Sequence, residues 1–307
     1  MYTPFAMASR GLALLRLTGW LLAVAVWAVP GLDAAELKFI TVSASAVPGY
    51  VRPLDAQGKP QAESYIFTQG RYFAGLTADA GLEQVKFDDI LKTLAPSLAK
   101  QNYFPAKEVP TADLLIMVHW GTTTVYEDPQ KAFQVDRVND ALGAYRASAD
   151  GNNGNADPGA LNQALGDQAA AQASAEAVLA RNSALLGYKP DLEREQRKLF
   201  PSTGELTMTA ELNEERYFVI LMAYDYRRMR TEHKSHLLWA TRISVRSPGS
   251  KFIEAMPALV QAGANVFGRK VDGLVRVDGR TREGRVDLGE MKIIGTVEDP
   301  QPGAPKK

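Results

Sequence analysis

The chain has 307 residues, of which 46% are hydrophobic and 23% charged, as is ordinary for a globular protein. Its 35 basic and 35 acidic side chains balance, which excludes the basic excess expected of a nucleic-acid-binding protein. The absence of cysteine excludes disulfides, thiol catalysis, cysteine-ligated metals and a lipid attached to a cysteine.

The first 35 residues have the pattern of a secretory signal peptide. Arg10 precedes an apolar core, residues 17–32 hold no charge, and Pro30 and small residues mark the end of the segment. This core is shorter than the roughly 20 apolar residues that a membrane helix needs. We therefore expect cleavage between Gly31 and Ala35 and export to the periplasm. The alternative is an uncleaved anchor, residues 11–32, in the inner membrane.

The segment after the signal peptide predicts two strands, a helix and a third strand. Residues 36–72 contain the β-favouring runs ELKFITVSAS and ESYIFTQGRYF, separated by a turn-rich stretch. Residues 87–99 carry apolar side chains at helical spacing, which predicts an amphipathic helix that Pro96 kinks or splits. The run ADLLIMVHWGTTTVY then predicts a strand from Ala112 to about Tyr126.

A helical insertion is expected at about residues 140–214. Residues 146–158, RASADGNNGNADP, predict a mobile loop, and its final Asp-Pro is typical of a helix start. The alanine-rich run that follows, to about Leu186, has high helix propensity but little apolar area. Residues 191–200 predict a short charged helix. We expect the 157–200 region to contact a protein partner in the envelope.

The C-terminal part predicts a hairpin, a helix and a last strand. ERYFVILMAYDYRR and HLLWATRISVRS read as antiparallel strands joined by a loose polar loop, MRTEHKS. The second strand alternates apolar residues with Arg242, Ser244 and Arg246, so one face should be buried and the other wet. KFIEAMPALVQAGANVFG predicts an amphipathic helix that Gly268 ends, and VDLGEMKIIGTVE predicts a strand.

This order of elements predicts an α+β fold: a mostly antiparallel sheet with amphipathic helices on one face, plus the alanine-rich helical insertion. Residues 36–296 are expected to form a single domain that contains the insertion. Residues 297–307 are expected to be a disordered tail, because DPQPGAPKK has little apolar surface to bury.

Two strand motifs resemble those of a group of bacterial envelope proteins of unknown function, which are small and often lipid-anchored α+β domains. The motifs are Ala112-Asp113-Leu114-Leu115 and Leu238-Trp239, and the resemblance covers about residues 64–126 and 215–268. It implies that both strands lie in one sheet, and it carries over no catalytic residue. The chain departs from the group by lacking the anchoring cysteine and by carrying the insertion, which would be an added surface.

The three histidines are the candidate metal ligands. His119 lies within a predicted strand, and the acidic residues Glu127 and Asp128 follow about 27 Å farther along an extended chain, so this stretch alone is no catalytic cluster. His233 and His236 have an i, i+3 spacing that would suit a metal on a helix, but they fall between two strands. Packed or solvated histidines are the favoured interpretation, and a metal site of His119, His233 and His236 is the alternative.

Arginines are the candidate ligand contacts. Arg227 lies beside tyrosines and Asp225. An arginine in such a setting can bind a carboxylate or phosphate through paired hydrogen bonds. Arg242 and Arg246 would line the polar face of the sheet. No Gly-x-Ser-x-Gly nucleophile motif, phosphate loop or dinucleotide fingerprint occurs in the chain.

These features predict an exported, non-enzymatic protein without a cofactor that binds a partner or contributes to the cell envelope. Two alternatives stay open at this point. One is a metal-dependent hydrolase that uses the histidines, and the other is a small-ligand binding module on the polar face of the sheet.

Overall fold

The computed structural model describes residues 39–75, 79–126, 131–151, 157–279 and 293–296. The described residues all belong to one compact unit. The predicted signal peptide and the predicted disordered tail lie outside the described residues. Among the helices in the described ranges, none combines the length and the apolar character needed to cross a membrane.

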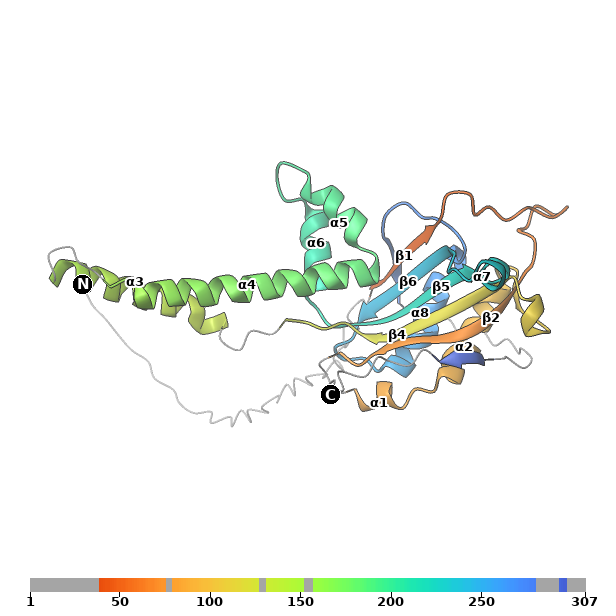
Figure 1. Cartoon of the computed structure of the whole chain (residues 1–307), viewed down its shortest axis with the longest axis horizontal. Coiled ribbons are helices and arrows are strands. Elements are labelled where there is room, and N and C mark those ends of the chain that lie inside the picture. The colour runs from red at the N-terminus through yellow and green to blue at the C-terminus, as the bar shows by residue number, and fades with distance from the viewer. Residues whose placement is uncertain (1–38, 76–78, 127–130, 152–156, 280–292, 297–307) are drawn as a thin grey trace, which may run out of the picture. The chain divides into compact units, whose positions relative to one another are not determined.

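A single mixed sheet organises the domain (Figure 1). Its strands lie in the order β3-β2-β4-β5-β6-β1-β7, and β8 also pairs with β2. Their bounds are Phe39–Ala46 (β1), Glu63–Phe73 (β2), Tyr103–Pro105 (β3), Leu114–Thr122 (β4), Arg216–Asp225 (β5), Leu237–Arg246 (β6), Val275–Asp278 (β7) and Ile293–Thr296 (β8). The pairs of β2 with β3, β4 and β8 are parallel, and the other pairs are antiparallel. The predicted α+β class and mostly antiparallel sheet are confirmed.

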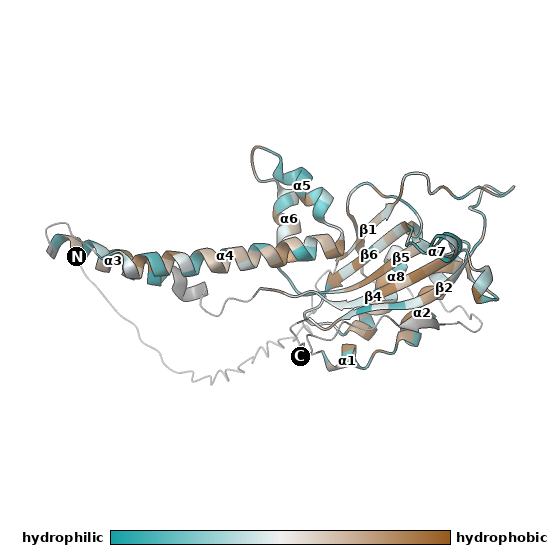
Figure 2. Cartoon of the chain, viewed as in Figure 1, coloured by the Kyte–Doolittle hydropathy of each residue, from teal (hydrophilic) through white to brown (hydrophobic). Residues whose placement is uncertain are grey.

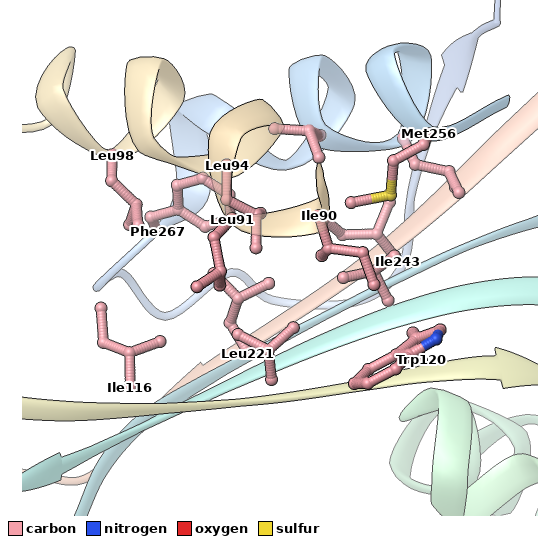
Figure 3. Packing of buried hydrophobic residues seen from close by; sticks show 14 of the residues in the cluster. Ile90, Leu91, Leu94, Leu98, Ile116, Trp120, Leu221, Ile243, Met256 and Phe267 are labelled. Carbon is pink, nitrogen blue, oxygen red and sulfur yellow. The ribbon is translucent and has the colours of Figure 1, made fainter. Parts of the chain in front are cut away.

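One face of the sheet is covered by the two predicted amphipathic helices, α2 (Phe87–Ala99) and α8 (Phe252–Gly263). Alternate residues of β4 point to this face, where Ile116 lies on the side of the α2 leucines (Figure 3) and Trp120 stacks on Phe87 of α2 at a centroid distance of 5.5 Å. The helix runs without interruption through Pro96, so the predicted split is not found. The proline lies in the last turn, where its missing N–H removes one hydrogen bond.

Part of the other face of the sheet is covered by the insertion, whose four helices α3–α6 we call the helical unit. The helices are α3 (Lys131–Gly151), α4 (Gly159–Leu186), α5 (Lys189–Gln196) and α6 (Thr203–Leu212). Leu186, Leu192 and Leu212 of this unit pack on Phe218 and Ile220 of β5 and form a second core. Figure 2 shows the contrast between the apolar strand β5 and the largely hydrophilic helix α5.

The wet face predicted for β6 is wrong for its C-terminal half, because the helical unit lies over it. Ser244 is only 2% exposed, and the neighbouring Arg216 of β5 is equally buried. The sequence alternation identified the polar face correctly. It could not show that an insertion from a distant part of the chain would remove that face from water.

Two predicted loops are in part helical. Residues 146–151 of the predicted mobile loop continue α3, and residues 152–156 lie outside the described ranges. Helix α4 begins at Gly159 with Pro158 as its N-cap, one residue later than predicted, and Asp157 Oδ1 accepts a hydrogen bond from the Gly159 N–H at 2.9 Å. The predicted loose hairpin loop contains most of a short helix, α7 (Tyr226–Glu232), because the Asp225 carboxylate caps the N–H of Arg228 at 2.9 Å.

Short elements complete the fold and were missed in the sequence. They are α1 (Ala80–Glu83), the 3₁₀ turns η1 (Val109–Thr111) and η2 (Ala264–Val266), strands β3 and β7, and helix α6. Elements of three or four residues carry too little periodicity to be recognised locally. Helix α6 has ten residues but buries only Met208 and Leu212, so its apolar pattern is weak. The predicted helix end at Gly268 is close to the observed end, because η2 follows α8 directly and Gly268 has a left-handed φ of 71°.

Candidate functional site

His119 occupies the middle of β4 and is partly buried. Its Nδ1 accepts a hydrogen bond from the backbone N–H of Arg71 at 2.8 Å, which selects the neutral tautomer with the proton on Nε2. Burial lowers the pKa of His119 below its ordinary value. His119 is therefore held by the sheet as a neutral ring.

The other two histidines lie at the far end of α7. His233 is the exposed C-cap of that helix, and His236 makes a 2.6 Å contact from Nε2 to Glu232 Oε2. His119 pairs with Ile220 of β5, whereas His236 lies opposite Asp225, five residues farther along the strand and about 17 Å away. The three histidines are thus not brought together. Across the described ranges, no group of three or more acidic or histidine side chains is arranged to hold a metal ion.

The three candidate arginines are each engaged within the domain. Arg227 forms an ion pair with Asp113, and Arg246 pairs through Nε with Glu214 Oε2 at 3.2 Å. Arg242 lies partly buried on β6, where desolvation lowers its pKa. The turn at Gly187 presses against Arg242, since a Cβ on Gly187 would lie 3.0 Å from its Cδ. The helical unit therefore fills the place of the expected ligand beside Arg242.

A buried polar network joins the helical unit to the sheet. The Tyr188 hydroxyl donates to Glu211 Oε2 at 2.7 Å, and Arg276 Nε of β7 donates to Glu211 Oε1 at 2.8 Å. Burial raises the pKa of Tyr188 to about 12, so its hydroxyl stays a donor at neutral pH. The neighbouring Arg216 donates from Nε to Ser244 Oγ at 3.2 Å. These bonds anchor one end of α4, and all their polar groups serve the fold.

The rest of α4 is far less embedded than this anchored end. Of its 28 residues, the buried ones are Ala164, Asn182, Ser183 and Leu186, and three of these four lie in the last five positions. The first part of α4 packs along α3, where Arg137 pairs with Asp167 at 2.7 Å. Alanine dominates this packing, so α3 and the first part of α4, to residue 173, form an arm. Its side chains at residues 136–150 and 159–173 bury little apolar area.

Exposed apolar side chains gather on the helical unit. Leu199 and Phe200 are adjacent in the α5–α6 connection and are 89% and 74% exposed. Leu206 of α6 and Leu165 of α4 are also exposed. The connection carries both signs of charge, because Lys198 pairs with Glu195 at 2.6 Å immediately before the two apolar residues. This surface combines exposed apolar side chains with a mixed polar rim.

A second feature, at the other end of the sheet, is a hydrogen-bonded cluster of Tyr50, Glu63, Tyr103 and Arg52. The Tyr50 hydroxyl donates to Glu63 Oε2 at 2.6 Å and lies 3.0 Å from the Tyr103 hydroxyl. The Arg52 guanidinium stacks 4.1 Å from the Tyr103 ring centroid, and its Nε lies 3.3 Å from Glu63 Oε2. Desolvation raises the pKa of both Tyr50 and Glu63, so Tyr50 remains a hydrogen-bond donor.

This cluster lies beside a cleft of about 630 Å³ between the β1–β2 and η2–β7 connections. The cleft is lined by Ala46, Val47, Pro48, Gly49, Tyr50, Val51, Arg52, Pro60, Gln101, Phe267, Gly268, Arg269 and Lys270. Gly268 is needed at its edge, because its φ is left-handed and a Cβ there would lie 1.8 Å from the Tyr103 hydroxyl. Sequence analysis missed this site because its loops are more than 200 residues apart. The only local signal was the Tyr50–Arg52 pair.

No protein-family model matches this chain, and no curated protein is significantly similar to it in sequence. Its function therefore has to be inferred from its own side chains and their arrangement.

Proposed function

We propose that the protein is exported to the cell envelope and acts there as a non-enzymatic binding domain whose helical unit contacts a protein partner. The signal-like N-terminal segment and the resemblance of its strand motifs to envelope domains support the location. The observation that carries the partner proposal is the adjacent pair Leu199 and Phe200, both of which face solvent almost completely.

Exposed apolar pairs of this kind suit a protein interface. Burying a side chain the size of phenylalanine or leucine contributes roughly 1.5–3 kcal/mol. Interfaces concentrate their binding energy in a few aromatic and arginine side chains surrounded by polar residues. Phe200 and Leu199 have that setting, since Arg197 and Lys198 precede them and Glu195 is near. The mixture of charge signs favours a protein partner over an anionic membrane or a nucleic acid.

The arm supports the same proposal. At 1.5 Å per residue, the 28 residues of α4 span about 42 Å. A helix of this length with burial concentrated at one end offers a long exposed surface, and a stable complex needs about 800 Å² from each partner. Its alanine-rich composition would let a partner helix approach closely, because alanine side chains are short.

Site-specific photocrosslinking in cells tests the proposal. A photoreactive amino acid at Phe200 should give one discrete covalent adduct with a protein of the envelope, and Leu199→Ser should reduce the yield at least about tenfold, since tenfold corresponds to 1.4 kcal/mol of binding energy. A photoreactive residue at Ile253, which is 56% exposed on α8, is the matched control and should give no such adduct. Equal adducts at both positions, or none at Phe200, would contradict the proposal.

A further inference from the structure

We infer that the cleft beside Tyr50 and Arg52 binds a small organic acid: a carboxylate carried on an apolar body. This site is separate from the helical unit, so it does not depend on the proposed partner. Its volume of about 630 Å³ falls in the range of 300–1,000 Å³ that small-molecule sites have.

The apolar part of the ligand would contact one wall and the floor of the cleft. Val47, Pro48 and Val51 of the β1–β2 connection supply that wall, opposite Phe267. The Phe267 ring is almost fully buried and is stacked on Trp239 at a centroid distance of 6.2 Å, so it cannot swing away. The aliphatic side chains of this lining suit a ligand with an aromatic or aliphatic body.

The charged part of the ligand would contact two exposed cations that line the cleft. Arg269 donates from Nη2 to Gln101 Oε1 at 3.3 Å, a neutral partner that leaves its charge uncompensated there. Lys270 Nζ lies 3.7 Å from Asp272 Oδ1, but these side chains are 70% and 95% exposed. Such an exposed ion pair contributes little free energy and holds the lysine only weakly. Both cations are therefore free to reorient toward a carboxylate, which an arginine can bind through two parallel hydrogen bonds.

The other charges near the cleft are already compensated. Arg52 donates to the carbonyl oxygens of Gln101 at 2.7 Å and Asn102 at 2.9 Å, and it also pairs with Glu63. Glu63 in turn accepts a hydrogen bond from the Tyr50 hydroxyl. This network holds the β1–β2 connection in place. Arg269 and Lys270 are then the cations that select a negatively charged ligand. A preorganised wall lowers the ordering cost of binding.

Calorimetry of the purified full chain with a matched pair of probes tests the inference. The probes are 4-phenylbutyrate and 4-phenylbutanol, which share an apolar body and differ in the charged group. We expect the acid to bind at least about tenfold more tightly than the alcohol, the equivalent of one properly placed charged contact. The double variant Arg269→Gln/Lys270→Gln should remove this preference while leaving binding of the alcohol unchanged.

Controls separate the site from general charge effects. Arg197→Gln/Lys198→Gln removes two exposed cations from the helical unit and should leave the preference intact. Thermal unfolding should show that both double variants are folded, since all four side chains are exposed. The inference is overturned if neither probe binds at millimolar concentration, if acid and alcohol bind alike, if inorganic phosphate binds as tightly as the acid, or if the two double variants behave the same.

Discussion

His119 and Arg71 are joined across two parallel strands by a 2.8 Å hydrogen bond in which the ring Nδ1 accepts the backbone N–H. A β-bulge makes the contact, because the register of β2 against β4 shifts between Gln69 and Tyr72. A protonated ring would present an N–H to this N–H donor. The bond therefore requires a neutral histidine.

This bond predicts an acid-dependent loss of stability. Burial lowers the pKa of His119 in the folded state, whereas the unfolded chain has the ordinary value near 6.5. The unfolded state then binds more protons, so the contribution of His119 is complete above pH 6.5 and declines as the pH falls below it. Urea unfolding from pH 7.5 to 5 should show a smaller decline in His119→Asn, whose amide oxygen still accepts the Arg71 bond.

The control for this experiment is His233→Asn, because His233 is exposed and has a left-handed backbone that asparagine tolerates. Its unfolding free energy should follow the unmodified protein over the whole pH range. If the unfolding free energies of His119→Asn and of the unmodified protein decline in parallel as the pH falls, His119 is not the group responsible for the loss of stability.

Gly70 makes room for the same histidine. A Cβ at Gly70 would lie 2.6 Å from His119 Nδ1, too close for an unshifted ring. We expect Gly70→Ala to lower the unfolding free energy by about 1–3 kcal/mol through overpacking. His119→Ser removes the ring. In a double-mutant cycle, the unfolding free energy lost by Gly70→Ala/His119→Ser should therefore be less than the sum of the losses in Gly70→Ala and His119→Ser. Strict additivity would mean that the glycine serves another purpose.

Shortening the arm should cost little stability. The Arg137–Asp167 ion pair places these residues side by side, so a short glycine-serine linker can replace residues 138–166. Ala164 is the one buried side chain of α4 that this removes, and we expect a shift in the melting temperature of a few degrees, as for about 1 kcal/mol. Leu186→Ala, at the anchored end of α4, should lower the free energy of unfolding by about 2–5 kcal/mol. If the shortened chain does not fold, the arm belongs to the core.

Export should remove the N-terminal segment. We expect the mature protein in the periplasm with its first residue inside the range 32–37, as determined by N-terminal sequencing of the fractionated protein. Replacing Leu21 and Leu22 by arginine breaks the apolar core of the signal and should leave the full-length chain in the cytoplasm. Recovery of the unaltered protein only from membranes, with Met1 in place, would instead support the anchored alternative.

The sequence by itself determined the elements whose periodicity is long and regular. In α2, the apolar residues recur every three or four positions, and Ile90, Leu94 and Leu98 are all buried. In β6, Trp239 and Ile243 are buried in the first core, on the face that the alternation assigned to the interior. Such patterns are local, and hydrophobic burial of one face follows from them directly. The α+β class followed from their order along the chain.

Only the tertiary structure decided which polar residues meet. Tyr50, Glu63 and Tyr103 share a hydrogen-bonded cluster although they come from one loop and two strands, and no local pattern links them. The three histidines share a residue type but lie apart, because strand register places His119 and His236 at different heights on β5. Arg216 begins β5 and is only 2% exposed, because the helical unit covers it. Burial of a polar group depends on what covers it, and that is set by distant segments of the chain.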